Sequence, residues 1–439
     1  MRRITRTVPV LLALALAAAA CGGDDDSGGG GGSTTQAQNL KGQKIEVAAV
    51  WTGAEQQNFQ QVLNGFSQKT GATVTYTPTG DNVSTYLGSK LEGGAPPDVA
   101  MLPQQGVLVQ FADQGSLKKV NSDVQAAVDA NFAPIWKNLA SVDGTLYGVY
   151  YKVANKSTVW YRPQAFQDAG ISDTPKTWDD FVQDAKTLSD SGVTPVSVGG
   201  ADGWTLTDWF ENVYLSQAGP DKYDQLSKHE IPWTDPSVTT ALQTLGQLWG
   251  DQKLMAGGAS GSLQTDFPTS VTNVFGKSPK AAMVYEGDFV SGVITDSTQS
   301  KLGTDALMFP FPAAGAQPAV VGGGDVAVIM KDSPASQAFL QYLASPEAAA
   351  IWAKLGGYSS ANKNLDLSNY PDPIAKAIGE AVVKAGDNVR FDMSDLAPAA
   401  FGGTVGKGEW KDLQDFLKNP SNVSGTAAQL EKDAKAAFQ

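Results

Sequence analysis

The sequence is poor in the side chains that most enzymes use for catalysis. Its 439 residues include one histidine, His229, and one cysteine, Cys21. Ser-His-Asp and Cys-His arrangements, and zinc sites built from His and Cys, fail for want of these residues or because of where they stand. We therefore expect no catalytic residue, no metal and no cofactor, and we interpret His229 as a surface residue.

Other signatures are missing as well. No Walker-type glycine loop or EF-hand loop occurs, and no phosphate-binding helix follows Gly322-Gly323-Gly324. A single cysteine leaves no disulfide to support the fold. The formal net charge of −13 argues against nucleic acid or an anionic membrane surface as a partner, and is compatible with a neutral ligand.

The only long apolar run lies near the start of the chain, at Val8–Ala20, behind a basic beginning. It is shorter than the roughly 20 residues that a membrane-spanning helix needs, and is typical of an export signal. The run ends at Ala18-Ala19-Ala20-Cys21, which resembles the lipobox of bacterial lipoproteins, although Ala18 stands where that motif usually has Leu. We expect residues 1–21 to be a signal peptide, with Cys21 lipidated; the alternative is ordinary cleavage beside an incidental cysteine.

The next segment, residues 22–43, is expected to be a flexible tether. Its first part is rich in Gly, Ser, Thr and Gln and contains Asp24-Asp25-Asp26, a composition that buries no core. A lone cysteine followed by such a segment is what an anchored domain requires. We therefore expect an extracytoplasmic protein that is attached to the membrane by lipid alone.

The remaining chain alternates between strand and helix patterns, which predicts an α/β fold with parallel strands covered by helices. Phe59, Val62, Leu63 and Phe66, for example, follow helical spacing and predict a helix that ends near Gly71. Roughly 400 residues exceed what one hydrophobic core usually covers, so two lobes are expected. Strands are predicted at 44–50, 72–77, 98–102, 147–160, 194–198, 281–285 and 326–330. Helices are predicted at 178–189, 206–218, 238–252, 335–343, 346–355, 373–384 and 427–437.

Aromatic and acidic residues follow several of these strands, where ligands of α/β proteins bind. Trp51 ends the first strand and Glu55 lies four residues later, although Thr52 to Glu55 also reads as a helix capping box. Trp204 follows a glycine-rich loop, Gly199–Gly203, that lets backbone approach a ligand. Trp209 shares a helical face with other apolar residues and is interpreted mainly as core. A flat aromatic ring beside carboxylates is typical of a sugar site.

Further candidates lie in the second half of the chain. Glu286 and Asp288 follow the strand 281–285, and their two-residue spacing on an extended segment would place both on one face. Two carboxylates are all that a glycosidase requires, so this enzyme class stays open. Asp325 follows the glycine run and precedes a strand. Tyr358 follows Gly356-Gly357, which is first a helix cap but leaves the ring free to reach a crevice.

Short segments in a characteristic order carry a resemblance to a known family. They are Val50-Trp51-Thr52-Gly53, Pro97-Asp98-Val99, Leu146–Tyr151, Val159–Arg162, Thr177–Phe181, Ala281–Asp288 and Gln341–Glu347. Together they make residues 44–438 similar to family 1 extracellular solute-binding proteins of ABC importers, particularly the maltose and α-glucoside receptors. The resemblance implies a periplasmic-binding-protein-like fold of two hinge-linked lobes with a ligand cleft between them. The residues that match cleft positions are Trp51, Glu55, Gln104, Trp204, Glu286, Asp288, Asp325 and Tyr358.

The resemblance also implies an organisation and partners. Residues 44–151 and 285–323 would form the first lobe, and residues 152–284 and 325–439 the second. The expected function is capture of a small carbohydrate and its delivery to the membrane subunits of an ABC transporter, by a monomer. Ligand contact with both lobes would favour the closed form. A secreted glycoside hydrolase and a structural adhesin remain as alternatives.

Overall fold

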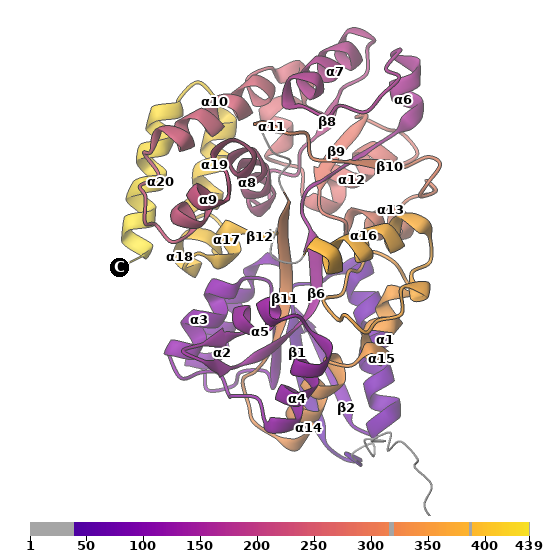
Figure 1. The fold of residues 1–439 in the computed structure, drawn as a ribbon, viewed down its shortest axis with the longest axis vertical. Helices are drawn as coiled ribbons and strands as arrows, with labels where there is room; N and C mark the ends of the chain where they lie inside the picture. Colours follow the sequence, from indigo (N-terminus) through magenta and orange to yellow (C-terminus); the bar gives the residue numbers. More distant parts are fainter. Residues whose placement is uncertain (1–38, 316–319, 386–388, 439) are drawn as a thin grey trace, which may run out of the picture. The chain divides into compact units, whose positions relative to one another are not determined.

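The computed structural model describes residues 39–315, 320–385 and 389–438. The expected signal peptide, the lipidated Cys21 and most of the tether lie outside these residues. The described chain is an α/β protein whose buried side chains form three clusters: a first core in the first lobe, and a second core with a smaller cluster beside it in the second lobe. Figure 1 shows the two lobes and the long strands β6 and β11 that run between them.

The first lobe is built on a mixed sheet. Strand β1 pairs in parallel with β2 and β3, as expected from the alternating pattern, whereas β11 joins antiparallel to β3 and β6. The sheet is therefore not purely parallel, because β11 returns from a distant part of the chain. Its strands are β1 (Lys44–Ala49), β2 (Thr73–Pro78), β3 (Val99–Leu102), β6 (Gly148–Asn155), β11 (Val321–Ile329) and β12 (Arg390–Phe391).

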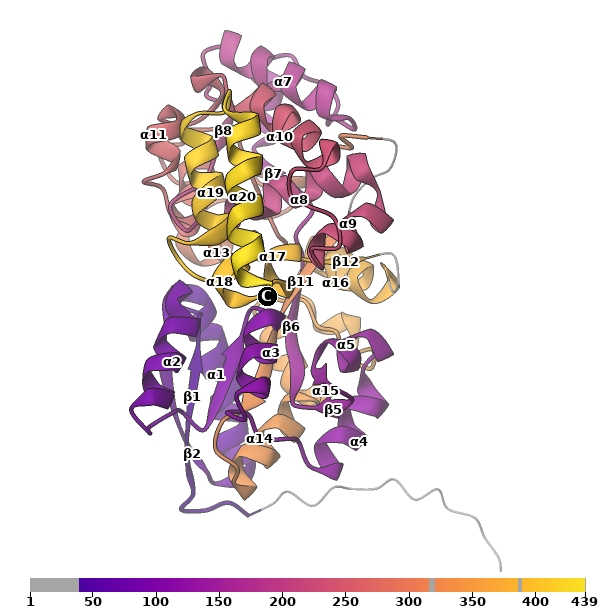
Figure 2. The ribbon, with the colours of Figure 1, turned by 90° about the vertical axis from the view of Figure 1, so that its left-hand side faces the viewer.

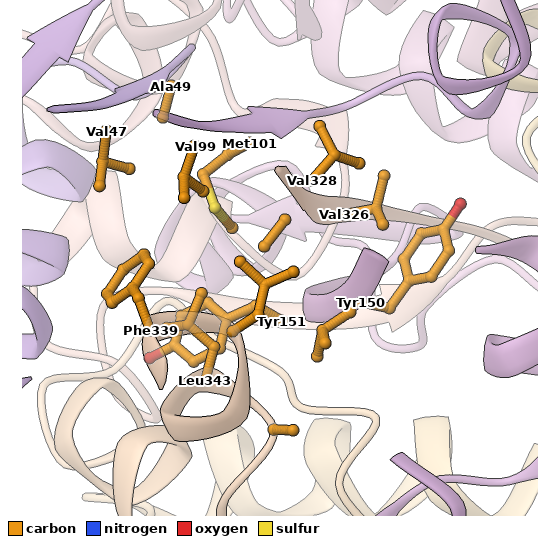
Figure 3. Close-up of a cluster of buried hydrophobic side chains, with 14 of the residues drawn as sticks. Val47, Ala49, Val99, Met101, Tyr150, Tyr151, Val326, Val328, Phe339 and Leu343 are labelled. Carbon is orange, nitrogen blue, oxygen red and sulfur yellow. The ribbon is translucent and has the colours of Figure 1, made fainter. Parts of the chain in front are cut away.

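Helices of the first lobe bury apolar faces against this sheet. In the first helix, Phe59, Val62, Leu63 and Phe66 are buried as their spacing predicts, and Gly71 ends the helix in the left-handed conformation that glycine adopts without strain. Figure 3 shows sheet residues such as Val99 and Val328 together with Phe339 and Leu343 of α14 in the buried cluster. The helices are α1 (Gly53–Thr70), α2 (Val83–Glu92), α3 (Gln105–Asp113), α4 (Ser122–Asn131), α5 (Pro134–Leu139), α14 (Pro334–Leu343) and α15 (Pro346–Ala353). The short hairpin β4 (Ser141–Val142) and β5 (Thr145–Leu146) and the 3-10 turns η1 (Gly80–Asn82) and η3 (Leu367–Asn369) complete it.

The second lobe has a smaller sheet in the order β10-β7-β9-β8. Its strands are β7 (Thr158–Tyr161), β8 (Val196–Ser197), β9 (Met283–Glu286) and β10 (Leu307–Pro310). Its helices are α6 (Pro163–Asp168), α7 (Trp178–Asp190), α8 (Trp204–Ala218), α9 (Pro220–Ser227), α10 (Pro236–Trp249), α11 (Gly258–Ser262), α12 (Phe267–Phe275), α13 (Val290–Ser297), α19 (Gly408–Lys418) and α20 (Val423–Ala437), with the turn η2 (Gln252–Leu254). Trp209 is buried in this core beside Trp178 and Tyr285, as interpreted from its helical face.

Two predicted elements are corrected where the chain passes between lobes. The single strand expected at 147–160 is two strands in different sheets, β6 and β7, because the chain leaves the first sheet after Asn155. The strand expected at 326–330 begins earlier, because the glycine run before Asp325 is part of β11 and pairs with β6. Val321 packs in the second core and Val326 in the first, so β11 crosses from one lobe to the other.

The expected assignment of segments to lobes is also wrong in the second half of the chain. Residues 285–323 were expected in the first lobe, yet Tyr285, Phe309 and Phe311 are buried in the second core. Conversely, α14 and α15 belong to the first core. The physical reason is the direction of β11, which brings the chain back to the first sheet and keeps its next two helices there.

Three helices lie where the lobes meet: α16 (Pro373–Ala385), α17 (Met393–Leu396) and α18 (Ala399–Gly402). Helices α17 and α18 contact α3 of the first lobe (Figure 2). The approach is close at Gly106, since a Cβ atom there would lie 1.8 Å from the carbonyl oxygen of Ala397. A residue without a side chain therefore permits this contact between the lobes. No helix among the described residues has both the length and the apolar character needed to cross a membrane.

Candidate functional site

A cavity of about 380 Å³ lies between the lobes, within the ~300–1,000 Å³ range of small-molecule sites. The first lobe contributes residues that follow β1 and β3 and residues of β6 and β11. The second lobe contributes the loop before α8, the start of α12 and α13, and Trp410 of α19. Of the predicted site residues, five line this cavity: Trp51, Glu55, Gln104, Trp204 and Asp325.

Trp51 and Glu55 are fixed by the turn from β1 into α1. The Trp51 ring meets Phe59 and Trp352 edge-on at centroid distances of 4.7 and 4.9 Å. Thr52 caps α1 without a side-chain hydrogen bond, so the capping box considered for Glu55 does not form. Glu55 instead makes an ion pair with Lys152 of β6, which directs its carboxylate toward the cavity rather than the helix end.

Lys152 and Lys156 supply the positive charge of the cavity wall. Burial acts against the charged form of Lys152, but Glu55, Asp325 and Asp288 together raise its pKa, so it stays protonated. Its ammonium also lies within 6 Å of the Trp51 ring, at 5.8 Å from the centroid. Both lysines were overlooked in the sequence, although charged residues inside an apolar strand run signal a special environment.

Asp325 and Gln104 bring polar atoms that the protein does not satisfy. Asp325 lies opposite Lys152 on the neighbouring strand, and burial raises its pKa to about 7 despite the attraction of Lys152. Its side chain makes no hydrogen bond to the described residues. Gln104 is 5% exposed, and its Oε1 atom likewise has no partner among them. Buried polar atoms without partners are costly, so both favour a ligand that donates hydrogen bonds.

The second lobe presents an aromatic wall. Trp204 is the first residue of α8, and its ring lies 5.5 Å from Phe267 and 6.0 Å from Phe289 between centroids. The Lys156 ammonium lies 5.6 Å from the same ring. Trp410 also lines the cavity, and its buried Nε1 donor has no partner among the described residues. These rings offer apolar faces and one free donor to a ligand.

Glu286, Asp288 and Tyr358 do not line the cavity, which corrects the expectation for these three residues. Burial raises the pKa of the Glu286 carboxyl to about 8, against the opposing effects of neighbouring Asp208 and Lys156. Asp288 instead accepts from the Ser359 hydroxyl at 2.5 Å, and Tyr358 donates to the Tyr151 carbonyl at 2.9 Å in the first core.

This arrangement also corrects the idea of paired carboxylates on one face. Glu286 is buried near Asp208 of α8 in the second lobe, whereas Asp288 is bonded to Ser359 in a loop of the first lobe, so the two side chains have separate environments. Two carboxyl groups that flank a bond in the cavity are needed for glycoside hydrolysis. No cluster of His, Cys, Asp and Glu suited to a metal ion occurs in the part of the chain that the structure describes.

Comparison with known proteins matches residues 50–350 to the family described as bacterial extracellular solute-binding protein. The chain is 33% identical to the osmoprotective compounds-binding protein GgtB of Synechocystis sp. over 85% of this chain and 88% of that protein. It is 31% identical to the alpha-glucosides-binding periplasmic protein AglE of Rhizobium meliloti, over 90% and 88% of the two chains.

Solved structures share the same fold. The bacterial solute receptor AcbH superposes with a TM-score of 0.77 at 23% identity, covering 90% of this chain and 99% of that one. Maltose-bound MalE3 of T. maritima gives 0.70 at 19% identity, with coverage of 90% and 99%. These likenesses establish the two-lobed, periplasmic-binding-protein-like architecture.

Proposed function

The chain belongs to the bacterial extracellular solute-binding proteins, a family of substrate-binding receptors rather than enzymes, and on this premise we propose that it captures a small sugar for an ABC importer. The proposed ligand is an α-glucoside or a short oligosaccharide. The names of these two relatives, for osmoprotective compounds and for alpha-glucosides, support a ligand of this kind.

The observation that carries the proposal is the set of unpartnered polar atoms in the cavity wall. Gln104 and Asp325 line the cavity from the first lobe and Trp410 from the second, and the Gln104 Oε1 and Trp410 Nε1 atoms have no partner among the described residues. A sugar hydroxyl both donates and accepts hydrogen bonds, so one polyhydroxy ligand satisfies all three. The apolar face of a sugar ring also suits the exposed face of Trp204, as aromatic rings gain from such contact.

The proposed mechanism follows because these polar atoms come from both lobes. A ligand that bonds to both lobes binds the closed form more tightly than the open one, and shifts the population toward closure. We propose that the closed pair of lobes is the form presented to the membrane subunits of the transporter, and that the protein acts as a monomer. Delivery then needs no bond breaking.

We further propose that Cys21 carries the lipid that holds the receptor at the membrane. The support is the sequence alone: a short apolar run, the Ala18–Cys21 motif and a tether composition after it. Because one acyl chain holds a protein only weakly, we expect more than one chain at this cysteine.

A sugar panel tests the binding function. Purified protein is incubated with maltose, trehalose and related sugars, and melting temperature and sugar integrity are followed together. A raised melting temperature with intact sugar supports the receptor, because a ligand that binds only the native state stabilises it. Consumption of a sugar would revive the glycosidase alternative, and no stabilisation by any member would favour the adhesin.

A matched pair of tryptophans tests the site. Trp204→Ala should weaken binding of the stabilising sugar by about tenfold or more, because the ring loses its contact with the ligand. Trp209, 1% exposed and packed in the second core, is the control. Trp209→Ala should destabilise the protein by about 3–5 kcal/mol. If Trp204→Ala lowers the melting temperature of unliganded protein as much, its ring serves the core instead.

A further inference from the structure

The charges in the cavity wall are strongly unequal. Two lysines, Lys152 and Lys156, are the cationic side chains that line it among the described residues. The carboxyl groups that line it are Glu55, Asp81, Asp202, Asp266, Asp325 and Asp395. This excess of acids bears on the charge of the ligand.

Neither lysine is free to meet an anionic ligand. Lys152 is paired with Glu55. The Lys156 ammonium lies 2.5 Å from the nearest oxygen of Asp392, and 3.3 and 3.4 Å from oxygens of Asp208 and Asp395. A phosphate or uronate group in the cavity would therefore compete with existing partners and face the remaining carboxyls.

Three of these aspartates line the cavity from the two lobes, and we call Asp81, Asp202 and Asp266 the aspartate cluster. Asp81 belongs to the turn η1 of the first lobe, and the other two to the second lobe. Asp202 accepts a hydrogen bond from the Phe267 amide at 2.6 Å, and Asp266 accepts one from the Thr269 amide at 2.8 Å. These amide bonds orient the carboxyls but do not neutralise them.

The cluster carries repulsion that no described cation relieves. Burial raises the pKa of Asp81 to about 6, with Glu55 and Asp266 adding repulsion. Burial likewise raises the pKa of Asp202 to about 7, opposed by the Phe267 amide and assisted by Asp81 and Asp266. Because these acids come from both lobes, closure brings like charges together once they ionise, and a positive group between them would remove that cost.

Independent features of the same cavity point to a ligand beside the cluster. Asp325 is 8% exposed, lines the cavity and makes no hydrogen bond to the described residues, and the Gln104 Oε1 atom is unpartnered too. Trp204 and Phe267 line the same cavity with ring centroids 5.5 Å apart, and aromatic faces attract cations. Hydrogen-bond acceptors, carboxyls and aromatic rings in one cavity suit a molecule with hydroxyls and an amine.

We propose that the aspartate cluster is a subsite for a protonated amine, so that the cavity takes amino sugars in preference to neutral sugars of the same shape and rejects sugar phosphates. The proposal rests on the sugar-binding function above and specifies the ligand's charge. The amine bridges carboxyls of both lobes, and therefore favours closure more than a hydroxyl at the same position does.

The preference depends on pH in a defined direction. Below about pH 5 both Asp81 and Asp202 are protonated, because their pKa values are about 6 and 7, and an amine gains little. Above these values the carboxylates are charged and the amine is favoured until it loses its own proton. If the bound amine lowers the pKa of one aspartate by a single unit, toward its ordinary value, the amine binds about tenfold more tightly. We therefore expect about a tenfold preference for the amine over the neutral sugar at pH 8.

Calorimetry with sugars that differ in one group measures this preference. The probes are trehalose, its 2-amino-2-deoxy and 6-amino-6-deoxy derivatives, and trehalose 6-phosphate. We expect at least one amine to bind about tenfold more tightly than trehalose at pH 8, a ratio near one at pH 5, and weakened or no binding of the phosphate. If trehalose binds and neither amine binds more tightly, the subsite is refuted while the sugar receptor stands. If none of the probes binds, the subsite is refuted, and the neutral panel decides whether sugar binding fails as well.

Substitutions locate the amine. In Asp81→Asn, which keeps shape and removes one charge, the ratio of amine to trehalose affinity at pH 8 should fall toward one. The matched control is Asp113→Asn, at an exposed position of α3 in the same lobe, and it should keep the wild-type ratio. An unchanged ratio in Asp81→Asn, with a melting temperature close to that of the control, would show that the amine binds elsewhere and would overturn the assignment.

Discussion

Lys156 stabilises a buried group of acids, and its replacement gives a sharp energetic prediction. Its side chain is 11% exposed and pairs with Asp392, whose side chain is fully buried, at 2.5 Å. Burial opposes the charge on Asp392, but Lys156 and the neighbouring hydrogen bonds hold the pKa of Asp392 well below its ordinary value. In Lys156→Met the carboxylate loses its cation. Breaking a buried pair in this way costs about 3–5 kcal/mol, so the free energy of unfolding should fall by that amount at pH 7.

The pH dependence of the loss follows from the sign of the shift. The depressed pKa of Asp392 contributes stability that is present above its unfolded pKa, near 4, and is lost as pH falls through the folded value. Without Lys156, burial raises the pKa of this carboxyl instead. The loss in Lys156→Met should therefore be greatest at pH 7 to 8 and shrink as pH approaches 4.

Urea unfolding followed by tryptophan fluorescence measures the loss, and two variants sharpen it. Adding Asp392→Asn to Lys156→Met should restore most of the stability, because the amide oxygen retains the bonds from Ser394 Oγ (2.8 Å) and the Asp395 amide (2.9 Å). Lys222→Met breaks an exposed pair and should cost below about 1 kcal/mol. The reasoning is refuted if Lys156→Met costs no more than Lys222→Met.

Three further predictions concern stability, closure and anchoring. Buried acids of the cavity such as Asp325 have raised pKa values, so their contribution to the folding stability is fully present below about pH 4 and is lost as pH rises through about 7. The unliganded protein should therefore melt at a higher temperature at pH 5 than at pH 8. A melting temperature that stays flat or rises with pH would contradict this. Gly106→Ala should hold the lobes apart at the Ala397 carbonyl, which should increase the radius of gyration in X-ray scattering and weaken the stabilisation of the protein by sugar. The control Gly88→Ala, where no atom lies within 4 Å of the new methyl group, should bind sugar normally. Cys21→Ser should move the receptor from the membrane fraction to the medium, and an unchanged distribution would argue against lipidation.

The local pattern of the sequence predicted individual elements well. The buried face of α1 and its end at Gly71 follow from helical spacing and the freedom of glycine. Strands β1, β2 and β3 likewise follow from short apolar runs between turns. Such features depend on neighbours within a few residues, and the sequence contains that information directly.

Part of the candidate site could be predicted from the sequence in the same way. Trp51 and Glu55 follow a strand and Trp204 begins a helix after a glycine-rich loop, so their place at the ends of elements put them in the cavity wall. Glu286 and Asp288 had the same signal, but Glu286 is buried near Asp208 and Asp288 is bonded to Ser359. The position of a residue along a strand or helix does not reveal how partners far away in the sequence orient its buried carboxyl group.

The sequence by itself determined the chemistry available to this protein: too few histidines and cysteines for most catalysis, one candidate lipid site and an alternating α/β chain. Only the tertiary structure decided how segments are shared between lobes, because β11 crosses from the second core to the first and carries α14 and α15 with it. It also decided which acids gather without cations, since Asp81 and Asp202 come together only when two lobes face each other. Burial and charge at such a meeting depend on contacts between residues far apart in the chain, and spacing along the sequence does not encode them.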